Sequence, residues 1–510
     1  MVIRQMPVRI VVTILFALFF LWIADPARYY FLNDDLYHIP LAAQKNFVHG
    51  TLLRPVSDLT LWLDHLFWGK DAYGYHLTNI ILHLIDTLLV YVFARQLFGL
   101  YSNKETAGVK SWLAALLFLL YAFHSESIFW IIGRGGSLST LFFLLACIGY
   151  LKRDVSAGYF FLSLLSFGVG LFAYESIWVF PLVALCLSAA EVYSRRQRWR
   201  KEWVYVLWVF LFFFVFLLFR RSQTGGLAGG YEMSTLLEGH VAGLLYNYNA
   251  LFARSFLPPV QNAKWFIFMY GLLWGLVVIA LYTLRKKGGV LHLLLAICFL
   301  VALTPAVSLG ISTHNSESER YIYLPSVFLV LWLVEIMSLL CRNNRVMIGL
   351  LLLVAMVNGY GLWQASRTYR YAGDVVKRSL VLAGRKETVR TLYLIHLPSQ
   401  YEGALIFRHG FGPGADWICP DLRYERLAVI DMKALDRRPD PFICGVASLG
   451  QAAASMRATL TPPAFDSSKD SLDRTGEGWV VNLPDTSFEF LPGRDMILYW
   501  TDNSLLKIRE

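Results

Sequence analysis

Charged residues are scarce in this sequence, and their scarcity decides its broad class. Only 16% of the 510 residues are Asp, Glu, Lys or Arg, whereas 56% are hydrophobic. A soluble chain carries roughly a quarter charged residues, which keep its surface in water. The hydrophobic residues also occur in blocks of about twenty, the length that crosses a bilayer as a helix. These features exclude an ordinary soluble protein and indicate a polytopic membrane protein.

Cysteine is also scarce and unevenly placed. Four of the six cysteines lie in or beside apolar runs and are explained as small core residues: Cys147, Cys186, Cys298 and Cys341. Cys419 and Cys444 lie in the more polar C-terminal part. An oxidising compartment permits a disulfide between these two, but their spacing alone does not decide whether the sulfur atoms meet.

Two common sequence features are missing. The glycine-rich stretch 225–230 has no P-loop lysine and no strand before it, which argues against a nucleotide-phosphate site. We interpret this stretch as a mobile cover over a site. We find no internal repeat, and no tetratricopeptide repeat in particular, so a repeat array is excluded.

The apolar runs predict about eleven transmembrane helices within residues 1–365. The runs are 8–24, 78–98, 111–123, 137–151, 157–173, 176–192, 203–219, 265–284, 289–303, 325–341 and 346–364. The part 111–151 can be divided differently. Because Ala24-Asp25-Pro26-Ala27 follows the first run, a cleaved signal peptide is an alternative. We favour a retained anchor, since the later spans need its orientation.

A net charge of +10 is compatible with a nucleic-acid partner, but the positions of the basic residues argue against one. With the N-terminus in the cytoplasm, most basic clusters fall in short loops on that same side, as the positive-inside rule requires. The clusters are Arg4 and Arg9, Lys104 and Lys110, Lys152 and Arg153, 195–201, 285–287, and Arg342 and Arg345. Binding of 195–201 to anionic headgroups is a secondary interpretation. An odd number of spans places the C-terminal part outside.

Residues 366–510 predict a small external α+β domain that is rich in strands. Short alternating runs such as 391–395 and 496–500 are separated by Gly and Pro. In the external loop 25–77, segments 36–47 and 59–67 each have one apolar face and predict short interfacial helices. The C-terminal domain shows no catalytic motif, so the site is expected in the transmembrane domain, 1–365.

Ionisable residues gather where the predicted spans meet the external face. Charges beside hydrocarbon are costly and are functional candidates, although each one alone is equally explained as an interface residue or a structural ion pair. They are Asp34, Asp35, His38, Arg54, Asp58, Asp64, His76, His124, Glu126, Arg134, Glu175, His314, Glu319 and Arg320. Because they come from several loops on one side, we predict that they surround one external cavity.

The adjacent aspartates Asp34 and Asp35 follow the first span. Asn33 or Asp34 also suits the cap of the next helix, and a cap does not exclude catalysis. A carboxylate can accept a proton from an attacking hydroxyl, while arginines hold a phosphate and stabilise its charge as it leaves. Nucleotide sugars are scarce outside the cytoplasm, so a lipid-anchored phosphate is the expected donor.

Four stretches between residues 30 and 330 occur in the order of a known family's motifs. They are Arg54-Pro55-Val56-Ser57 through 74–83 (GYHLTNIILH), 124–134 (HSESIFWIIGR), Tyr174-Glu175-Ser176 before Pro181, and 319–326 (ERYIYLPS). With the aspartate pair, they resemble GT-C superfamily glycosyltransferases, most closely the transmembrane TPR-containing O-mannosyltransferases and their bacterial relatives. Tyr174 stands where that family has lysine, Ser125 where it has proline, and the TPR array is absent.

The resemblance implies a GT-C fold and an inverting transfer of a sugar, with mannose one candidate. The donor would be polyprenyl-phosphate-linked and the acceptor a hydroxyl of a protein, glycolipid or polysaccharide on the external face. It implies Asp34 as the general base, Asp35 as the neighbour that orients it or raises its pKa, and Arg134 and Arg320 as ligands of the donor phosphate. The implied sugar or acceptor contacts are His38, Arg54, His76, His124, Glu126, Glu175 and Glu319. His83 lies deeper and is expected to be structural.

No obligatory metal or cofactor is expected; a divalent cation on Asp34, Asp35 and Glu126 is the alternative. The missing TPR array favours a bacterial inner membrane, with the site and the C-terminal domain in the periplasm. Two other classes compete with an enzyme. A transporter or flippase of lipid-linked sugars would show charges deep in its spans and a two-fold repeat, and neither is evident. A structural membrane subunit would use its external tail to bind partners.

Overall fold

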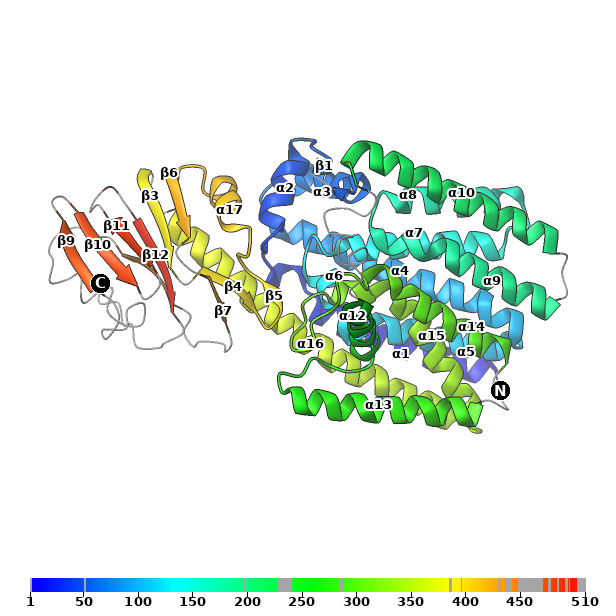
Figure 1. The fold of residues 1–510 in the computed structure, drawn as a ribbon. Helices are drawn as coiled ribbons and strands as arrows, with labels where there is room; N and C mark the ends of the chain where they lie inside the picture. Colours follow the sequence, from blue (N-terminus) through cyan, green and yellow to red (C-terminus); the bar gives the residue numbers. More distant parts are fainter. Residues whose placement is uncertain are drawn as a thin grey trace. The chain divides into compact units, whose positions relative to one another are not determined.

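The computed structural model divides the chain into two compact units (Figure 1). The membrane unit comprises 1–27 and 41–367, and the C-terminal unit comprises 28–40 and 368–510. The structure describes residues 2–49, 52–195, 199–226, 241–284, 289–384, 388–395, 397–429, 432–435, 443–447, 471–475, 478–483, 486–490, 494 and 496–501. The division after Arg367 lies close to the predicted boundary, whereas the grouping of 28–40 with the C-terminal unit was not predicted.

Helices make up most of the described membrane unit, and most of them follow the predicted apolar runs. They are α1 (Val2–Ile23), α3 (Pro55–Trp68), α4 (Ala72–Tyr101), α5 (Lys104–Leu119), α6 (Ser125–Phe129), α7 (Arg134–Leu151), α8 (Ala157–Leu171), α9 (Phe180–Arg195), α10 (Trp199–Thr224), α12 (Val241–Arg254), α13 (Ala263–Leu284), α14 (Val290–Ala302), α15 (Tyr323–Leu340) and the first part of α16 (Asn344–Ala383). Short 3₁₀ helices join several of them: η2 (Ala122–His124), η3 (Glu175–Val179), η4 (Thr304–Ala306) and η5 (Glu319–Ile322). A two-residue hairpin, β1 (Val48–His49) with β2 (Leu52–Leu53), precedes α3.

The predicted class, an α-helical polytopic membrane protein, is confirmed, and the spans identified among the described residues are fewer than the predicted eleven. Among the described residues, seven helices are long and apolar enough to cross a membrane, or eight if the bent pair α5 and η2–α6 counts as one span. Three further apolar segments do not meet this test: Ala157–Leu171, Lys264–Val278 and Val290–Ala306. Lys264–Val278 is part of α13, which has 22 residues. Because a helix rises 1.5 Å per residue, the other two fall short of the ~20 residues that match the hydrocarbon core.

The membrane unit is held together by helices that pack closely around aromatic side chains. α4 packs against both α5 and α7, and α7 packs against α8. The Phe328 ring of α15 lies 6.1 Å from Phe93 and 5.8 Å from Phe143, measured between centroids. A Cβ added to Gly149 would lie 2.7 Å from the Tyr159 carbonyl oxygen. The small residue therefore sets how closely α7 and α8 approach, as at many helix contacts in membranes.

The C-terminal unit combines the end of α16 with short strands and two short helical segments, as the α+β prediction requires. Its elements are α2 (Asp35–Ala43, up to Pro40), β3 (Thr388–Ile395), β4 (Leu397–Tyr401), β5 (Ala404–Leu405), α17 (Phe411–Ile418), β6 (Arg423–Val429), β7 (Met432–Leu435), β8 (Ile443–Ala447), β9 (Ser471–Thr475), β10 (Gly478–Leu483), β11 (Thr486–Phe490) and β12 (Met496–Thr501). The largest sheet has the order β6-β3-β12-β8. Its two central strands are the predicted runs 391–395 and 496–500, which pair in parallel. The predicted interfacial helices 36–47 and 59–67 correspond to α2 and α3.

The sequence left a disulfide between Cys419 and Cys444 open. The Cys419 sulfur donates to the Leu380 carbonyl oxygen at 3.1 Å. The side chain of Cys444 lies outside the described part of the chain. Burial and the neighbouring Cys419 raise the pKa of the Tyr30 hydroxyl, in the same unit, to about 12, so that phenol stays protonated at neutral pH.

Candidate active site

Glu126 organises the loop that precedes η5. Its buried carboxylate accepts from the backbone amides of Ser318 and Arg320, at 2.9 and 3.1 Å, and from the Arg320 guanidinium at 2.8 Å. Ser318 has a φ of 75°, in the left-handed region, so that the loop turns toward the carboxylate. Gly133 lies so close that an added Cβ would be 2.0 Å from the Glu126 carbonyl oxygen. The contacts of Glu126 and Arg320 therefore hold the stretches 124–134 and 319–326 together.

A second buried pair connects the same two stretches to α12. Glu319 accepts from the Ser125 hydroxyl at 2.5 Å and pairs with Arg254 at 2.6 Å. Arg254 is fully buried and also donates to the backbone carbonyls of Ser312 and Leu257. Burial lowers the pKa of the Arg254 guanidinium, and the Glu319 carboxylate opposes that effect. Arg254, which sequence reasoning missed, therefore balances the charge of a predicted site residue.

Arg134 lies in the protein interior, with acceptors around it. Its guanidinium pairs with Asp64 at 2.6 Å and donates to the Tyr75 carbonyl oxygen at 2.9 Å. Thr78 donates to the second oxygen of Asp64 at 2.7 Å, and Asn79 donates to the Trp130 carbonyl oxygen at 2.9 Å. Through these bonds the GYHLTN stretch at the start of α4 is joined to α3 and to the segment 130–134.

Glu175 bridges two guanidinium groups at the start of η3. One of its oxygens accepts from Arg54 at 2.9 and 2.8 Å, and the other pairs with Arg220 at 3.1 Å. Arg54 lies over the Tyr174 ring at 4.4 Å, and Arg220 lies over Trp178 at 5.2 Å. Two cations share one carboxylate, so this cluster carries an excess positive charge that suits an anion.

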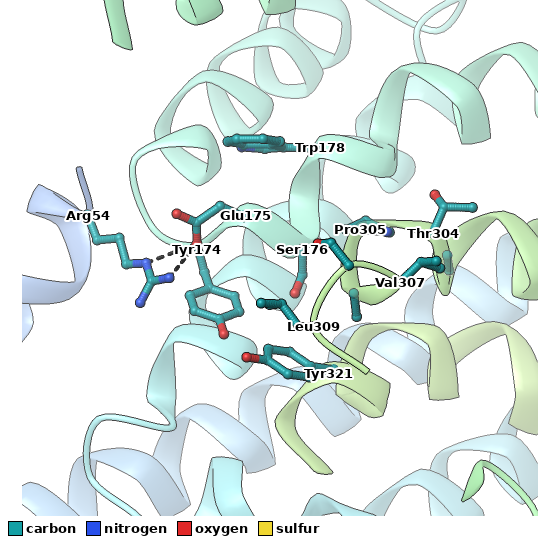
Figure 2. Close-up of a pocket in the computed structure, with 13 residues that line it drawn as sticks. Arg54, Tyr174, Glu175, Ser176, Trp178, Thr304, Pro305, Val307, Leu309 and Tyr321 are labelled. Carbon is teal, nitrogen blue, oxygen red and sulfur yellow. Dashed lines mark hydrogen bonds and ion pairs between the residues drawn. The ribbon is translucent and has the colours of Figure 1, made fainter. Parts of the chain in front are cut away.

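A cavity of about 240 Å³ opens beside this cluster. It is lined by Arg54, Tyr174, Glu175, Ser176, Trp178, Ala302, residues 304–309 and Tyr321. Figure 2 shows Arg54 turned toward Glu175 and Tyr174, with Pro305 and Val307 on the other side of the cavity. The lining therefore combines one charged wall with a largely apolar one, an arrangement that accommodates an amphiphile.

Arg320 is connected to the cavity through Tyr321. The Arg320 guanidinium donates to the Tyr321 hydroxyl at 3.0 Å and lies 4.6 Å from the centre of its ring. Because Glu126 holds the other side of Arg320, its position is fixed from two directions. Two of the predicted site arginines, Arg54 and Arg320, are thus in contact with residues that line the cavity.

Two of the predicted site histidines, His76 and His124, lie deeper in the membrane unit. His76 and His124 are at most 1% exposed and are not among the residues that line the cavity. His124 lies 2.8 Å from the Ser326 hydroxyl. His83 is bound between the Tyr323 hydroxyl, at 2.7 Å, and the Leu119 carbonyl oxygen, at 3.0 Å. The structural role expected for His83 fits these contacts.

The acidic pair belongs to the C-terminal unit, where its two members differ in burial. Asp35 is fully buried, and its carboxylate accepts from the Leu32 amide at 2.9 Å. Asp34 is half-buried and accepts from the Asn33 side-chain amide at 2.9 Å. His38, also half-buried, follows one turn later on α2. Asp35 therefore fastens the turn that starts α2, while the Asp34 carboxylate is the more accessible of the two.

Other residues of the site had weak signals in the sequence. Arg220 follows the predicted run 203–219 at the end predicted to be external, where the positive-inside rule disfavours a basic residue, and that misfit could have identified it. Trp178, Tyr321 and Arg254 had no comparable signal. Among the described residues, no group of three or more His, Cys, Asp or Glu side chains could hold a metal ion; independence from metal stays a prediction.

Part of the chain is similar in sequence to protein O-mannosyl-transferases, although no family model matches it. The relative tmtc2 of Xenopus laevis is 37% identical over 106 residues, which is 21% of this chain and 12% of that protein. TMTC4 of Homo sapiens is 40% identical over 106 residues, 19% of this chain and 14% of that protein. TMTC1 of Homo sapiens is 33% identical over 134 residues, 26% and 14% respectively. The similar region is therefore about a fifth to a quarter of this chain and a smaller share of each relative.

Two solved structures align with most of the chain at low identity. ArnT from Cupriavidus metallidurans bound to undecaprenyl phosphate covers 94% of this chain and 97% of its own, with a TM-score of 0.47 and 10% identity. The apo form of ArnT covers 95% and 99%, with a TM-score of 0.45 and 11% identity.

Proposed function

We propose that this protein is a membrane glycosyltransferase, which moves a sugar from a polyprenyl-phosphate donor to a hydroxyl acceptor with inversion. The observation that carries the proposal is the cavity of the membrane unit, where the Arg54–Glu175 pair faces apolar residues such as Val307 and Leu309. A lipid phosphate has a charged head and an apolar chain, and the two walls offer a partner to each. The local similarity to O-mannosyl-transferases supports the same class of reaction.

Arg320 and Arg54 are the proposed ligands of the donor phosphate. The side chains of both are 16% exposed, whereas that of Arg134 is 1% exposed. We therefore give Arg134, predicted as a phosphate ligand, the role of holding α3 and α4 together. As the bond from sugar to phosphate breaks, negative charge grows on the phosphate, and two fixed guanidinium groups stabilise that charge.

Asp34 is the proposed general base. It takes the proton of the acceptor hydroxyl while the hydroxyl oxygen bonds to the anomeric carbon, opposite the departing phosphate. Polyprenyl phosphate leaves with the electron pair of the broken bond, so the configuration inverts. Asp35 orients Asp34 through the first turn of α2, and His38, four residues after Asp34 on the same helix face, is a proposed acceptor contact.

The other residues predicted to contact the sugar or acceptor differ in how exposed their side chains are. Glu175 lines the cavity and keeps that proposed role. His76, His124, Glu126 and Glu319 are at most 2% exposed, and we assign them to holding the loops of the site. Mannose and a protein, lipid or polysaccharide hydroxyl remain the proposed sugar and acceptors. We place the reaction on the external face of the membrane, a bacterial periplasm, with the N-terminus in the cytoplasm.

The proposal is tested with full-length protein in lipid vesicles that contain mannosyl polyprenyl phosphate and membrane acceptors extracted from the source cells. Mass spectrometry follows the glycosylated products and the released polyprenyl phosphate. Since a general base contributes ~10²- to 10⁴-fold, we expect Asp34→Asn to lower transfer by at least ~100-fold. Arg320→Gln should raise the KM for the donor, because a charged phosphate contact is lost.

Asp71→Asn is the matched control. Asp71 caps α4 by accepting from the Tyr73 amide at 3.0 Å, and Asn caps equally well, so this variant should transfer at the wild-type rate. Full transfer by Asp34→Asn would contradict the proposal. Movement of the donor across the bilayer without any transfer would instead support a transporter.

A further inference from the structure

The C-terminal unit surrounds the backbone directly before the acidic pair. The Asn33 amide donates to the Ile406 carbonyl oxygen at 2.9 Å, and the Asn33 side-chain oxygen accepts from the His409 amide at 2.8 Å. The side-chain nitrogen of Asn33 donates to Asp34 Oδ1 at 2.9 Å. One amide side chain therefore connects a loop that lies 376 positions away to the carboxylate of the proposed base.

Asn33 is held in a single arrangement by these bonds. It is fully buried, and its φ of 39° places it in the left-handed region, which asparagine tolerates better than most residues with a side chain. Its carbonyl oxygen accepts from the Leu36 amide in the first turn of α2, at 3.1 Å. A buried amide with each polar group engaged cannot rotate without losing hydrogen bonds.

Close packing between α2 and α17 supports the same arrangement. A Cβ added to Gly410 would lie 2.2 Å from the Asn33 carbonyl oxygen, and one added to Gly414 would lie 2.8 Å from a methyl carbon of Leu36. The Phe31 and Trp417 rings are 5.0 Å apart. The position of the acidic pair thus depends on contacts within the C-terminal unit.

We propose that Asn33, His409 and Gly410 are positioning residues for Asp34, so that the C-terminal unit is part of the catalytic apparatus and not only a recognition domain. This inference rests on the proposed function, in which Asp34 is the base. A base acts only within hydrogen-bond reach of its hydroxyl, and a displacement of about 1 Å can cost ~100-fold in rate. Asn33 also donates a hydrogen bond that favours the ionised carboxylate.

Two substitutions in the full-length protein test this inference in the transfer assay with mannosyl polyprenyl phosphate. Asn33→Gly keeps the left-handed backbone accessible and removes only the side-chain connection. Gly410→Ala pushes on the Asn33 carbonyl and leaves every polar group in place. We expect kcat to fall by about 10- to 100-fold in both. The KM for the donor should be unchanged, because its proposed phosphate ligands lie in the membrane unit.

The pH profile separates positioning from a loss of structure. In Asn33→Gly, the acidic limb of the kcat profile should move to higher pH, since the Asp34 carboxylate has lost a donor to its ionised form. Gly412→Ala is the matched control. Its Cβ would meet a methyl carbon of Leu427 at 3.1 Å, away from Asn33, and its kcat and pH profile should equal those of the wild type.

The outcomes distinguish this inference from the function on which it rests. Wild-type kcat and pH profile in Asn33→Gly and Gly410→Ala, beside an inactive Asp34→Asn, would overturn the inference and leave the proposed function standing. An equal loss in Gly412→Ala would overturn it as well, because the effect would then not depend on Asn33. Retained transfer in Asp34→Asn would overturn the proposed function itself.

Discussion

Glu126, Glu319 and Asp64 are buried carboxylates that each lie beside one particular guanidinium. Their partners are Arg320 at 2.8 Å, Arg254 at 2.6 Å and Arg134 at 2.6 Å. Removing one member of a buried pair strands the other charge and costs about 3–5 kcal/mol, whereas an exposed pair contributes about 0–1 kcal/mol. Several motif positions are therefore explained by the need to balance the charge of a neighbouring residue, and the proposed phosphate ligands are the more exposed arginines.

Asp64→Asn tests whether Arg134 has a structural role. The substitution leaves the buried guanidinium without its counter-charge, so we expect a loss of stability of about 3–5 kcal/mol. This appears as a lower midpoint of thermal unfolding in detergent, while the KM for the donor stays close to wild type. Glu105→Gln, in the exposed first turn of α5, is the control, with an expected loss of only about 0.3–1 kcal/mol. An unchanged unfolding midpoint together with a raised KM for the donor would instead support Arg134 as a ligand of the donor phosphate.

The sequence predicts most helices, but it does not predict which helices and loops contact one another. A run of about twenty apolar residues has one stable backbone solution in a bilayer, so the existence of most helices follows from composition. Glu126 and Ser318 are 192 positions apart, and His83 and Tyr323 are 240 apart, so no local pattern shows that they meet. The sequence predicted that the charged loops converge on one external cavity; of those charged residues, Arg54 and Glu175 line the described cavity. The individual pairs could be identified only from the fold.

Two glycines in long helices should respond to the same substitution with opposite signs. Gly149→Ala forces a Cβ against the Tyr159 carbonyl and the Ser163 amide of α8, so overpacking should destabilise the protein by about 1–3 kcal/mol. Gly99→Ala in α4 meets no atom within 4 Å, and the better helix former should stabilise it by about 1 kcal/mol. Thermal unfolding of both variants in one detergent measures the difference. A stabilised Gly149→Ala would contradict the close α7–α8 contact.

Two separate segments of the chain, 28–40 and 368–510, belong to the C-terminal unit. A division drawn from composition alone places 28–40 with the membrane spans, because the segment follows an apolar helix and has no strand pattern. What assigns it to the other unit is a set of tertiary bonds, such as that from the His409 amide to Asn33. Local sequence does not contain that information.

Cysteine labelling at both ends of α4 and in the C-terminal unit tests which side of the membrane each position faces. Asp71 and Glu105 flank α4 and are exposed, as is Asp421 of the C-terminal unit. In a background without native cysteines, Asp71→Cys and Asp421→Cys should react with an impermeant maleimide in sealed right-side-out vesicles. Glu105→Cys should react only after permeabilisation, because a helix of this length and apolarity separates the two compartments.

The labelling pattern distinguishes two ways in which the predicted membrane topology would be wrong. Equal reactivity of Asp71→Cys and Glu105→Cys would show that α4 does not cross the membrane. Protection of Asp421→Cys beside a reactive Asp71→Cys would mean that the number of crossings between them is odd. The C-terminal unit would then lie on the opposite side from the loop that precedes α4. The apolar segments Ala157–Leu171, Lys264–Val278 and Val290–Ala306 would be the first places to correct the topology.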